Sequence, residues 1–419
     1  MSNLISNLER LLKRQKNEIN HGIVMNYHDR DALETLISAL NSPLVKVILG
    51  PRRCGKSTLA KKAVQGRKFA YLNFEDEGFP VDATGDDIMS ALERVYPDAE
   101  ILFFDEIQNF DRWEQFIHRL HREGRNLIVT GSNAHLLSQE LASALTGRHL
   151  AIKILPFSYK EFLGRQQKDS EELFLSYLVN GGYPEIVTGL SESSSYLGAL
   201  WDSIILKDVV RRHRIRNVRD LHALYNLMLH SVTTRFNNES LVRAMGQAVS
   251  APTIKNFLMY GEQAYLFADL DRFHFGVRKR LKFDRKAYIF DNGFLAAKKV
   301  STSPDHGRLL ENLVFIELVR RGFEPGLSLF YFVSQSGYEV DFLTRVDGKT
   351  DQLIQVTWQM SEAKTRDREI RGLRAASDEM KVRKTLILTF DHRETISGNN
   401  TEIIVEPIRE WLLHPLTST

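Results

Sequence analysis

A glycine-rich segment that follows an apolar run constrains the fold of this chain most. The segment LGPRRCGKST covers residues 49–58 and comes directly after the mostly apolar run VKVI. Its spacing fits the pattern G-x-x-x-x-G-K-[ST], which needs a strand before the turn and a helix that opens at the lysine. The sequence therefore predicts an α/β layer whose first strand leads into a phosphate-binding loop (P-loop).

The residues of this loop are the candidate nucleotide ligands. Backbone N–H groups of the turn would surround the phosphates, the Lys56 side chain would reach the β- and γ-phosphates, and the Ser57 hydroxyl would bind Mg²⁺. We expect Cys54, the single cysteine, to be a small tolerated loop residue and not a redox switch. The predicted nucleotide-binding residues of the loop are Gly50, Pro51, Arg52, Arg53, Cys54, Gly55, Lys56, Ser57 and Thr58.

A second motif, ILFFDEIQN at residues 101–109, places two adjacent carboxylates after an apolar run. Asp105 would hold the Mg²⁺ shell, and Glu106 would polarise the attacking water. Adjacent carboxylates at the end of a strand can be no more than a solvated turn. Because a P-loop precedes them at a suitable distance, we expect a site that hydrolyses the nucleotide.

Two later segments could contact the γ-phosphate. The run IVTGSN ends in polar side chains, among which Ser132 and Asn133 could report which nucleotide is bound. Arg148, in LTGRHL, could be an arginine finger that acts within the chain or across a subunit boundary. An ordinary surface arginine is the alternative that the sequence leaves open.

The pattern of apolar runs divides the 419 residues into three parts. Up to about Pro156, short apolar runs alternate with amphipathic stretches, which indicates a parallel sheet with helices on both faces. A mostly helical pattern follows, and then a mixture of strands and helices. The predicted domains are a P-loop ATPase domain at 1–160, a helical and winged-helix-like module at 161–275, and a mixed α/β domain at 276–419.

Composition excludes several classes of protein. A single cysteine excludes a disulfide framework and a cysteine-rich zinc site, and it suits a reducing cytosol. The first 20 residues lack the apolar core of a signal peptide. No apolar run approaches the roughly 18 residues that a membrane-spanning helix needs. We therefore expect a soluble, cytoplasmic protein without a membrane partner.

The predicted middle module contains a candidate for binding double-stranded DNA. Residues 239–263 read as a helix, a break at Ala251-Pro252, and a second helix that starts with Thr253, Lys255 and Asn256. In helix-turn-helix proteins the second helix lies in the major groove. A helical packing module that makes subunit contacts is the alternative.

Two basic clusters flank this candidate. The segment KDVVRRHRIRNVRD at 207–220 has five arginines, and RKRLKFDRK at 278–286 has six lysines or arginines against one aspartate. The first cluster could bind DNA or be a solvated helix face. The second could contact phosphates or form the surface of a domain junction.

Several segments, taken in order, resemble a widespread prokaryotic family of AAA-type ATPases. They are LGPRRCGKST, YLNFEDE, ILFFDEIQN, VTGSN, LTGR, LPFSYKEFL and NGGYPEIV. The resemblance covers nearly the whole chain after residue 20, and it is specific because the motifs come in the order of the family. It implies ATP and Mg²⁺ as cofactors, and a C-terminal domain of nuclease-like fold.

Three elements of the C-terminal part resemble the PD-(D/E)xK nuclease fold. They are Glu311 in RLLENLVFIEL, Asp341 in YEVDFLT, and the run LIQVTW. Such nucleases need an acidic pair that holds Mg²⁺ and a lysine two residues after the second acid. Here Gln355 and Thr357 stand at the last two positions, so we expect a degenerate site of Glu311, Asp341 and Gln355, with Lys364 as the available substitute cation.

The sequence as a whole predicts an ATP-binding and ATP-hydrolysing enzyme that couples its nucleotide state to DNA or to a protein partner. Glu106, Lys56 and Arg148 are the predicted catalytic residues. A homo-oligomer would be required if Arg148 acts in trans. Two alternatives stay open: a nucleotide-gated signalling switch that acts on a protein without DNA, and an ATP-gated nuclease.

Overall fold

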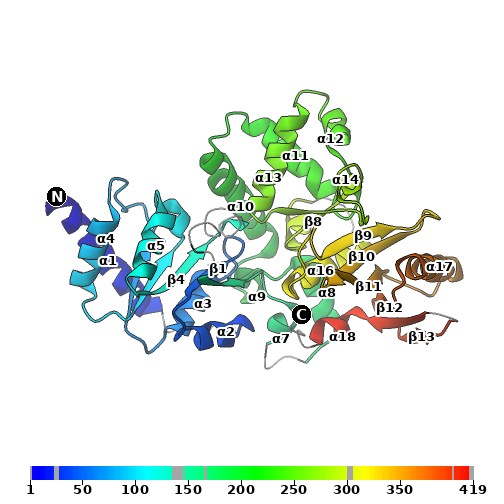
Figure 1. The fold of residues 1–419 in the computed structure, drawn as a ribbon, viewed down its shortest axis with the longest axis horizontal. Helices are drawn as coiled ribbons and strands as arrows, with labels where there is room; N and C mark the ends of the chain where they lie inside the picture. Colours follow the sequence, from blue (N-terminus) through cyan, green and yellow to red (C-terminus); the bar gives the residue numbers. More distant parts are fainter. Residues whose placement is uncertain are drawn as a thin grey trace. The chain divides into compact units, whose positions relative to one another are not determined.

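The structure is a computed structural model that describes residues 2–22, 28–134, 145, 147–164, 168–299, 305–398 and 401–414. The chain forms two compact units, residues 1–155 and 156–419 (Figure 1). The sequence also predicts a helix that begins near His135. This segment and Thr146 of LTGRHL lie outside the described residues. None of the helices in the described ranges is long and apolar enough to cross a membrane.

The first unit is built on a five-stranded parallel sheet in the order β2-β3-β4-β1-β5. Its strands are β1 (Val45–Leu49), β2 (Phe69–Asn73), β3 (Ile101–Asp105), β4 (Asn126–Gly131) and β5 (His149–Lys153). Because all five strands run in one direction, their carboxyl ends share one edge of the sheet. The loop after β1 and Asp105 at the end of β3 therefore meet at that edge.

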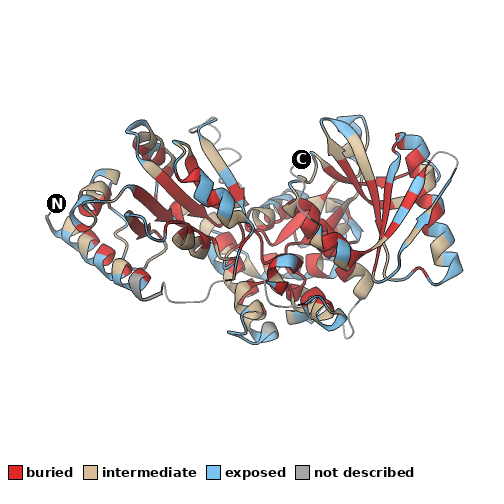
Figure 2. Ribbon diagram, turned by 90° about the horizontal axis from the view of Figure 1, so that it is seen from below, coloured by how far each residue is buried: buried red, intermediate tan, exposed pale blue. Residues whose placement is uncertain are grey.

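Helices cover both faces of this sheet. Its helices are α1 (Ser2–Gly22), α2 (Ala32–Ala39), α3 (Lys56–Ala63), α4 (Gly85–Val95), the 3-10 turn η1 (Ile107–Asn109) and α5 (Trp113–Arg122). Val47 and Phe104 pack with α1, α4 and α5 on one side, whereas Ile48 and Phe103 pack with α2 and α3 on the other. Strands β1 and β3 are buried along their whole length, and Figure 2 shows buried strands in the layer between the helices of this unit. The predicted two-sided parallel sheet is confirmed.

The second unit begins with helices and a small sheet. Its first elements are α7 (Tyr159–Leu163), α8 (Glu171–Asn180), α9 (Pro184–Val187), α10 (Ser193–Ile204), the π-helix η4 (Ile205–Arg211), α11 (Val218–His230), β6 (Arg235–Phe236), α12 (Asn238–Ala244), α13 (Ala251–Gln263), β7 (Phe267–Leu270), α14 (Val277–Arg280) and β8 (Arg285–Ile289). The antiparallel sheet has the order β6-β8-β7. Three helices, α11, α12 and α13, share an apolar core with it.

A mixed six-stranded sheet forms the rest of the second unit, in the order β13-β14-β12-β11-β10-β9. The remaining elements are α15 (Gly293–Ala297), α16 (His306–Arg320), β9 (Leu329–Val333), β10 (Glu339–Val346), β11 (Lys349–Val356), α17 (Ala363–Met380), β12 (Lys384–Thr389), β13 (Glu394–Ile396), β14 (Glu402–Pro407) and α18 (Ile408–Leu413). Strands β11, β12 and β14 are parallel, and the other pairings are antiparallel. The sequence predicts strands at the apolar runs LFYFVS, VDFLTR, LIQVTW, KTLILTF and EIIVEP, and five of the six strands overlap these runs.

A tight turn after α8 packs against a buried carboxylate. The Gly182 and Gly293 N–H groups donate hydrogen bonds to Asp291, at 2.8 and 2.9 Å. Gly181 has a left-handed backbone (φ +78°), and a Cβ on it would lie 1.8 Å from Asp291 Oδ1. Burial raises the pKa of Asp291 to about 7. Glycine is therefore required at position 181 for both conformation and space.

Candidate nucleotide-binding site

The loop between β1 and α3 is held in a fixed backbone conformation. Gly55 takes a left-handed conformation (φ +95°) and forms the N-cap of α3. A Cβ on Gly50 would lie 2.0 Å from the backbone oxygen of Ile154, so the loop passes directly against the chain that follows β5. The Arg30 guanidinium donates to the backbone oxygens of Cys54 and Leu155. The loop thus presents the start of α3 at the carboxyl edge of the sheet.

Cys54 is a packing residue of this loop. Its thiol is fully buried, and its Sγ lies 3.7 Å from the backbone oxygen of Ile154. Burial raises the pKa of the Cys54 thiol. A buried, protonated thiol is a poor nucleophile, which agrees with the expectation of a small tolerated residue.

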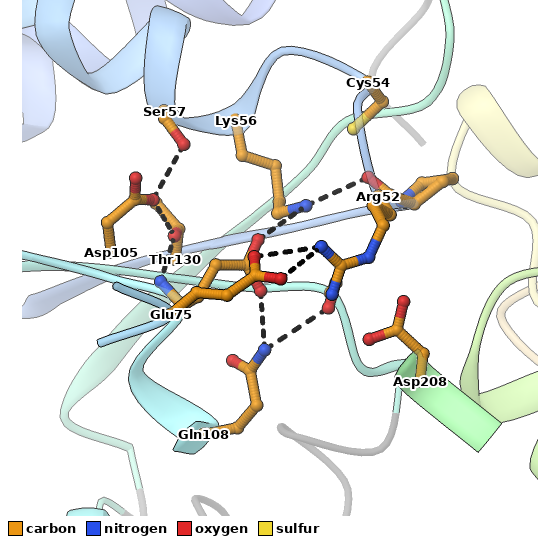
Figure 3. Close-up of polar contacts among 12 residues, drawn as sticks. Arg52, Cys54, Lys56, Ser57, Glu75, Asp105, Gln108, Thr130 and Asp208 are labelled. Atoms are coloured by element: carbon orange, nitrogen blue, oxygen red, sulfur yellow. Dashed lines mark hydrogen bonds and ion pairs between the residues drawn. The ribbon is translucent and has the colours of Figure 1, made fainter. Parts of the chain in front are cut away.

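Asp105 lies at the end of β3, where three hydroxyl groups donate to its carboxylate. Ser57 Oγ donates at 2.8 Å, and Thr130 donates to the same oxygen as Ser57 (Figure 3). The Tyr71 hydroxyl donates to the other carboxylate oxygen at 2.9 Å. Burial and the neighbouring Glu106 charge raise the pKa of Asp105, and the three hydroxyls act in the opposite direction. A serine hydroxyl beside a carboxylate is the set of oxygen donors that suits Mg²⁺ with a phosphate substrate.

Glu106 follows Asp105 in a left-handed conformation (φ +51°). Its backbone N–H donates to Thr130 Oγ1 at 3.0 Å, and its carboxylate lies 3.3 Å from the Lys56 Nζ. Burial alone would raise the pKa of Glu106. The Lys56 charge, together with hydrogen bonds from Gln108 and Ser132 and the Arg52 charge, lowers it to about 2. Glu106 is therefore ionised at neutral pH, so that it can accept a hydrogen bond from a water molecule.

Lys56 is buried at the start of α3. Its Nζ donates to the backbone oxygen of Pro51 at 2.9 Å and pairs with Glu106. Burial lowers the pKa of Lys56, but the carboxylates around it, Glu106 first, raise it above the ordinary lysine value overall. The ammonium group is charged and lies beside the glycine-rich turn, where phosphates would be expected.

Gln108 links the acidic pair to the end of β4. Its Nε2 donates to Glu106 Oε2 at 2.6 Å and to Ser132 Oγ at 3.3 Å (Figure 3). Of the two predicted γ-phosphate contacts, Ser132 is thus part of the site. Asn133 follows it and is half-buried.

Arg52, in the loop, is fixed by a carboxylate that follows β2. Its guanidinium nitrogen lies 2.7 and 2.9 Å from the two carboxylate oxygens of Glu75. Asn73 Oδ1 accepts the Glu75 N–H at 2.9 Å and orients that segment. Arg53, by contrast, has an exposed side chain.

Arg148 lies at the opposite edge of the sheet. It directly precedes β5, whose first residue, His149, pairs with Val45 at the amino end of β1. Its side chain is exposed, and its backbone oxygen accepts the Val45 N–H at 3.0 Å. The five-residue strand β1 separates this point from the loop by about 15 Å. This position favours action on a second copy over action within the chain, and the role of Arg148 stays a prediction.

Comparison with known proteins gives the family. A family model described as an AAA domain matches residues 42–163, and two domains of unknown function, DUF8612 and DUF4143, match residues 171–304 and 306–410. The uncharacterized protein MJ1544 of Methanocaldococcus jannaschii is 34% identical over 394 residues, which cover 88% of this chain and 87% of that protein. The chain belongs to an AAA-type ATPase family. Nucleotide binding and hydrolysis are the activities of its first unit.

Other relatives of this AAA-type ATPase are more distant. An uncharacterized protein of Haemophilus influenzae is 28% identical over 404 residues, 91% of this chain and 97% of that protein. Among solved structures, the Walker-type ATPase PABY2304 of Pyrococcus abyssi is similar with a TM-score of 0.42 at 16% identity, over 65% of this chain and 96% of that one.

Three residues of the ATPase site, Tyr71, Glu75 and Gln108, are not among those predicted from the sequence. Tyr71 and Glu75 belong to β2 and the segment after it, and they reach the site because Asn73 pairs with Asp105 in the sheet. Gln108 lies two residues after Glu106. The acidic segment FEDE and the glutamine of DEIQN were the available signals, but neither carries a motif with a defined spacing.

The residues predicted to form a degenerate nuclease-like site in the second unit do come together. Gln355 Oε1 accepts the Asp341 N–H at 3.3 Å, and Asp341 Oδ2 accepts the Val356 N–H at 3.0 Å. Lys286 of β8 joins Asp341 to Glu311, and its Nζ lies 3.1 and 2.7 Å from their carboxylates. The predicted cation Lys364 is exposed on α17.

Lys286 is the centre of a buried ionic cluster. Its Nζ also lies 2.7 Å from Glu339, and Tyr288 donates to Glu311 at 2.7 Å. Burial alone would lower the pKa of Lys286, but the surrounding groups raise it well above the ordinary value. Burial raises the pKa of Glu311. Within the described ranges, no group of three or more His, Cys, Asp or Glu side chains is arranged to hold a metal ion.

Proposed function

We propose that this ATPase hydrolyses ATP with Mg²⁺ in its first unit and couples the nucleotide state to the binding of duplex DNA by its second unit. ATP hydrolysis is supported by the arrangement of three side chains at the carboxyl edge of the sheet. Ser57 and Asp105 lie side by side as oxygen donors, and the ionised Glu106 lies next to them on a rigid turn.

Each residue of the site has a separate role in binding or hydrolysing the nucleotide. Ser57 and Asp105 would hold Mg²⁺, which neutralises phosphate charge and orients the leaving group. Lys56 and the backbone N–H groups of the loop bind phosphate oxygens. Glu106 is ionised and polarises the attacking water by accepting a hydrogen bond from it. Gln108 and Ser132 position that carboxylate.

The second part rests on the module formed by residues 218–289. A winged-helix fold is supported by the order of elements in this module and by the order of its strands. The elements are a helix, a strand, two helices, a strand, a loop and a strand, and the sheet order is β6-β8-β7. Lys255 and Asn256 are exposed on α13, which is the expected recognition helix. Ser250 caps that helix by accepting the Thr253 N–H. Arg211, Arg214, Arg216 and Arg219 are exposed nearby in sequence and offer phosphate contacts.

The buried cluster around Lys286 does not favour a nuclease. The carboxylates of Glu311 and Asp341 already bond to the lysine ammonium, whereas cleavage would need them as metal ligands. If the wild type cleaves DNA with a metal ion and Asp341→Ala does not, the second unit is a nuclease. A trans role for Arg148 would make the working form an oligomer.

The test is the ATPase rate with and without duplex DNA, at low and at high salt. We expect DNA to stimulate the rate, and the stimulation to fall with salt because phosphate contacts release counterions. Glu106→Gln should abolish turnover and keep nucleotide binding. The exposed Glu77→Gln, with the same loss of charge outside the site, should behave as the wild type.

Two results would contradict parts of this proposal. Turnover that survives in Glu106→Gln would remove Glu106 from its role. If the ATPase rate is normal but does not change when DNA is added, the proposed ATP hydrolysis stands and the proposed DNA binding is wrong. The partner of the second unit would then be a protein.

A further inference from the structure

The loop that joins β7 to β8 exposes three apolar side chains close together. Phe275, Val277 and Leu281 have 73%, 66% and 82% of their surface exposed. They lie within seven consecutive residues, in and around the single-turn helix α14. Isolated exposed apolar residues are common on proteins. A group of three on one short loop indicates a contact surface.

Basic side chains alternate with these apolar ones. Arg278, Lys279 and Lys282 are exposed, and among the described residues none of the three has an ion pair. Residues 271–286 hold seven lysines or arginines against two aspartates. The surface is therefore both apolar and positively charged, which favours a polyanionic partner with an apolar interior.

The base of the loop is anchored, so that its tip is presented on a rigid support. The Phe273 N–H donates to the Tyr331 oxygen at 2.7 Å, and the Tyr331 N–H donates to the Asp271 oxygen at 3.1 Å. Arg272 donates to the Val333 oxygen at 2.9 Å. These bonds tie the start of the loop to β9.

Aromatic and polar contacts hold the other side of the base. The Arg280 guanidinium lies 5.1 Å from the centre of the Phe273 ring, and its Nε donates to the His274 oxygen. Asn237, just before α12, donates to Asp284 at 2.7 Å. Arg272 and Arg280 are thus used in packing, whereas Arg278, Lys279 and Lys282 are not.

We propose that the tip, residues 275–282, is a wedge for duplex DNA. Phe275 and Leu281 enter the minor groove between base steps, and Arg278, Lys279 and Lys282 contact the flanking phosphates. This inference rests on the proposed DNA binding and adds to it a deformation, because apolar wedges unstack a base step and kink the duplex by about 20–90°.

DNA fits this tip better than a membrane surface does. Amphipathic helices that lie on membranes are often 20–30 residues long, whereas α14 has four residues and the apolar group has three side chains. The strand β7 that leads into the loop also follows α13, which carries the exposed Lys255 and Asn256. The same module therefore offers one element for each groove.

The experiment uses the full chain and a short duplex with donor and acceptor dyes at its ends. Binding is measured by anisotropy between about 50 and about 200 mM salt, and bending by energy transfer. The first variant is Phe275→Ser with Leu281→Ser, and the second replaces Arg278, Lys279 and Lys282 by Gln. Val81→Ser, at a fully exposed valine of the first unit, is the matched control.

We expect the first variant to lose the bend and to keep the salt dependence of binding. The second should lower the slope of log K against log salt by roughly 3, since each phosphate contact contributes about 0.9. The control should change neither quantity. All substitutions lie at exposed positions, and equal melting temperatures will show that the fold is intact.

Three outcomes would overturn the wedge, and they are distinguishable. If the wild type binds DNA and neither variant changes bend or slope, the wedge is wrong and the proposed DNA binding stands. If the wild type binds no DNA at low salt, both proposals fail. If it binds vesicles of phosphatidylcholine and phosphatidylserine through Phe275 and Leu281 and does not bind DNA, the tip is a membrane contact.

Discussion

The hydroxyl of Thr130 accepts the backbone N–H of Glu106 at 3.0 Å. The same hydroxyl donates to Asp105, so that one side chain orients both members of the acidic pair. Glu106 has a left-handed backbone, which for a residue other than glycine costs about 1–2 kcal/mol. The contact with Thr130 is therefore part of what keeps the glutamate in place.

Thr130→Val removes this hydroxyl with little change in shape. We expect the ATPase rate to fall at least tenfold, because Glu106 loses its fixed orientation. The free energy of unfolding should fall by about 1–3 kcal/mol, since a buried N–H loses its acceptor. Steady-state turnover and urea denaturation measure the two effects. Thr35→Val, at an exposed helical position, is the control, and equal effects in both variants would contradict the assignment.

Arg148 provides a test of action between subunits. We expect Arg148→Ala to lower turnover by about 10³-fold or more if the residue is an arginine finger. Because it lies at the edge of the sheet opposite the loop, a mixture of Arg148→Ala and Glu106→Gln should regain activity that neither variant has alone. Normal turnover in Arg148→Ala would show that it is an ordinary surface arginine.

Lys286→Met should destabilise the second unit. It leaves the carboxylates of Glu311 and Asp341 without their cation, whereas Glu339 keeps its ion pair with Arg235. Breaking such a buried pair costs about 3–5 kcal/mol at neutral pH. Protonation of the carboxylates at low pH relieves this repulsion, so the loss should be smaller at acidic than at neutral pH. Chemical denaturation at both pH values measures it. Lys279→Met, at an exposed lysine, should cost nothing at either pH.

Gly181→Ala and Gly189→Ala distinguish the cost of a left-handed backbone from the cost of a steric clash. Both glycines have left-handed backbones, at φ +78° and +70°. A Cβ at position 189 meets no atom within 4 Å, whereas at position 181 it would strike Asp291. We expect a loss of about 1–2 kcal/mol for Gly189→Ala from strain alone, and at least about 4 kcal/mol for Gly181→Ala. Similar losses in denaturant melts would contradict the role given to Asp291.

His213 predicts a pH dependence of stability. Its ring stacks on that of Tyr260, with 3.7 Å between the ring centres. Burial and the Arg212 charge lower the pKa of His213 to about 4. The unfolded chain, with a histidine pKa of about 6.5, binds more protons between these values. The contribution of His213 is therefore present above about pH 6.5 and is lost as the pH falls toward 4. His213→Phe keeps the stacking and should show a smaller loss of unfolding free energy on acidification than the wild type.

The parallel sheet of the first unit could be predicted because its strands are buried on both faces. Residues such as Phe103 and Phe104 pack on opposite sides, and the strand therefore reads as a continuous apolar run. Lys56, Ser57, Asp105 and Glu106 could be predicted because each belongs to a short motif with a defined spacing. The two-residue strand β6 was too short to give any such pattern.

Contacts between distant segments could not be predicted. The sequence places RKAYI of β8 in a basic cluster, but Lys286 is buried with carboxylates from α16 and β10. The predicted cation Lys364 follows Gln355 in the sequence, whereas the cation that contacts Glu311 and Asp341 is Lys286, from another strand. Glu75 likewise reaches Arg52 only because β2 and β3 pair in register.

The position of Lys286 has a consequence for how this chain can be divided. The lysine belongs to the segment that matches one domain of unknown function, at 171–304, and its three carboxylates belong to the next, at 306–410. A recombination point between them would separate the ammonium group from the carboxylates that it pairs with. We therefore expect that neither segment is stable without the other.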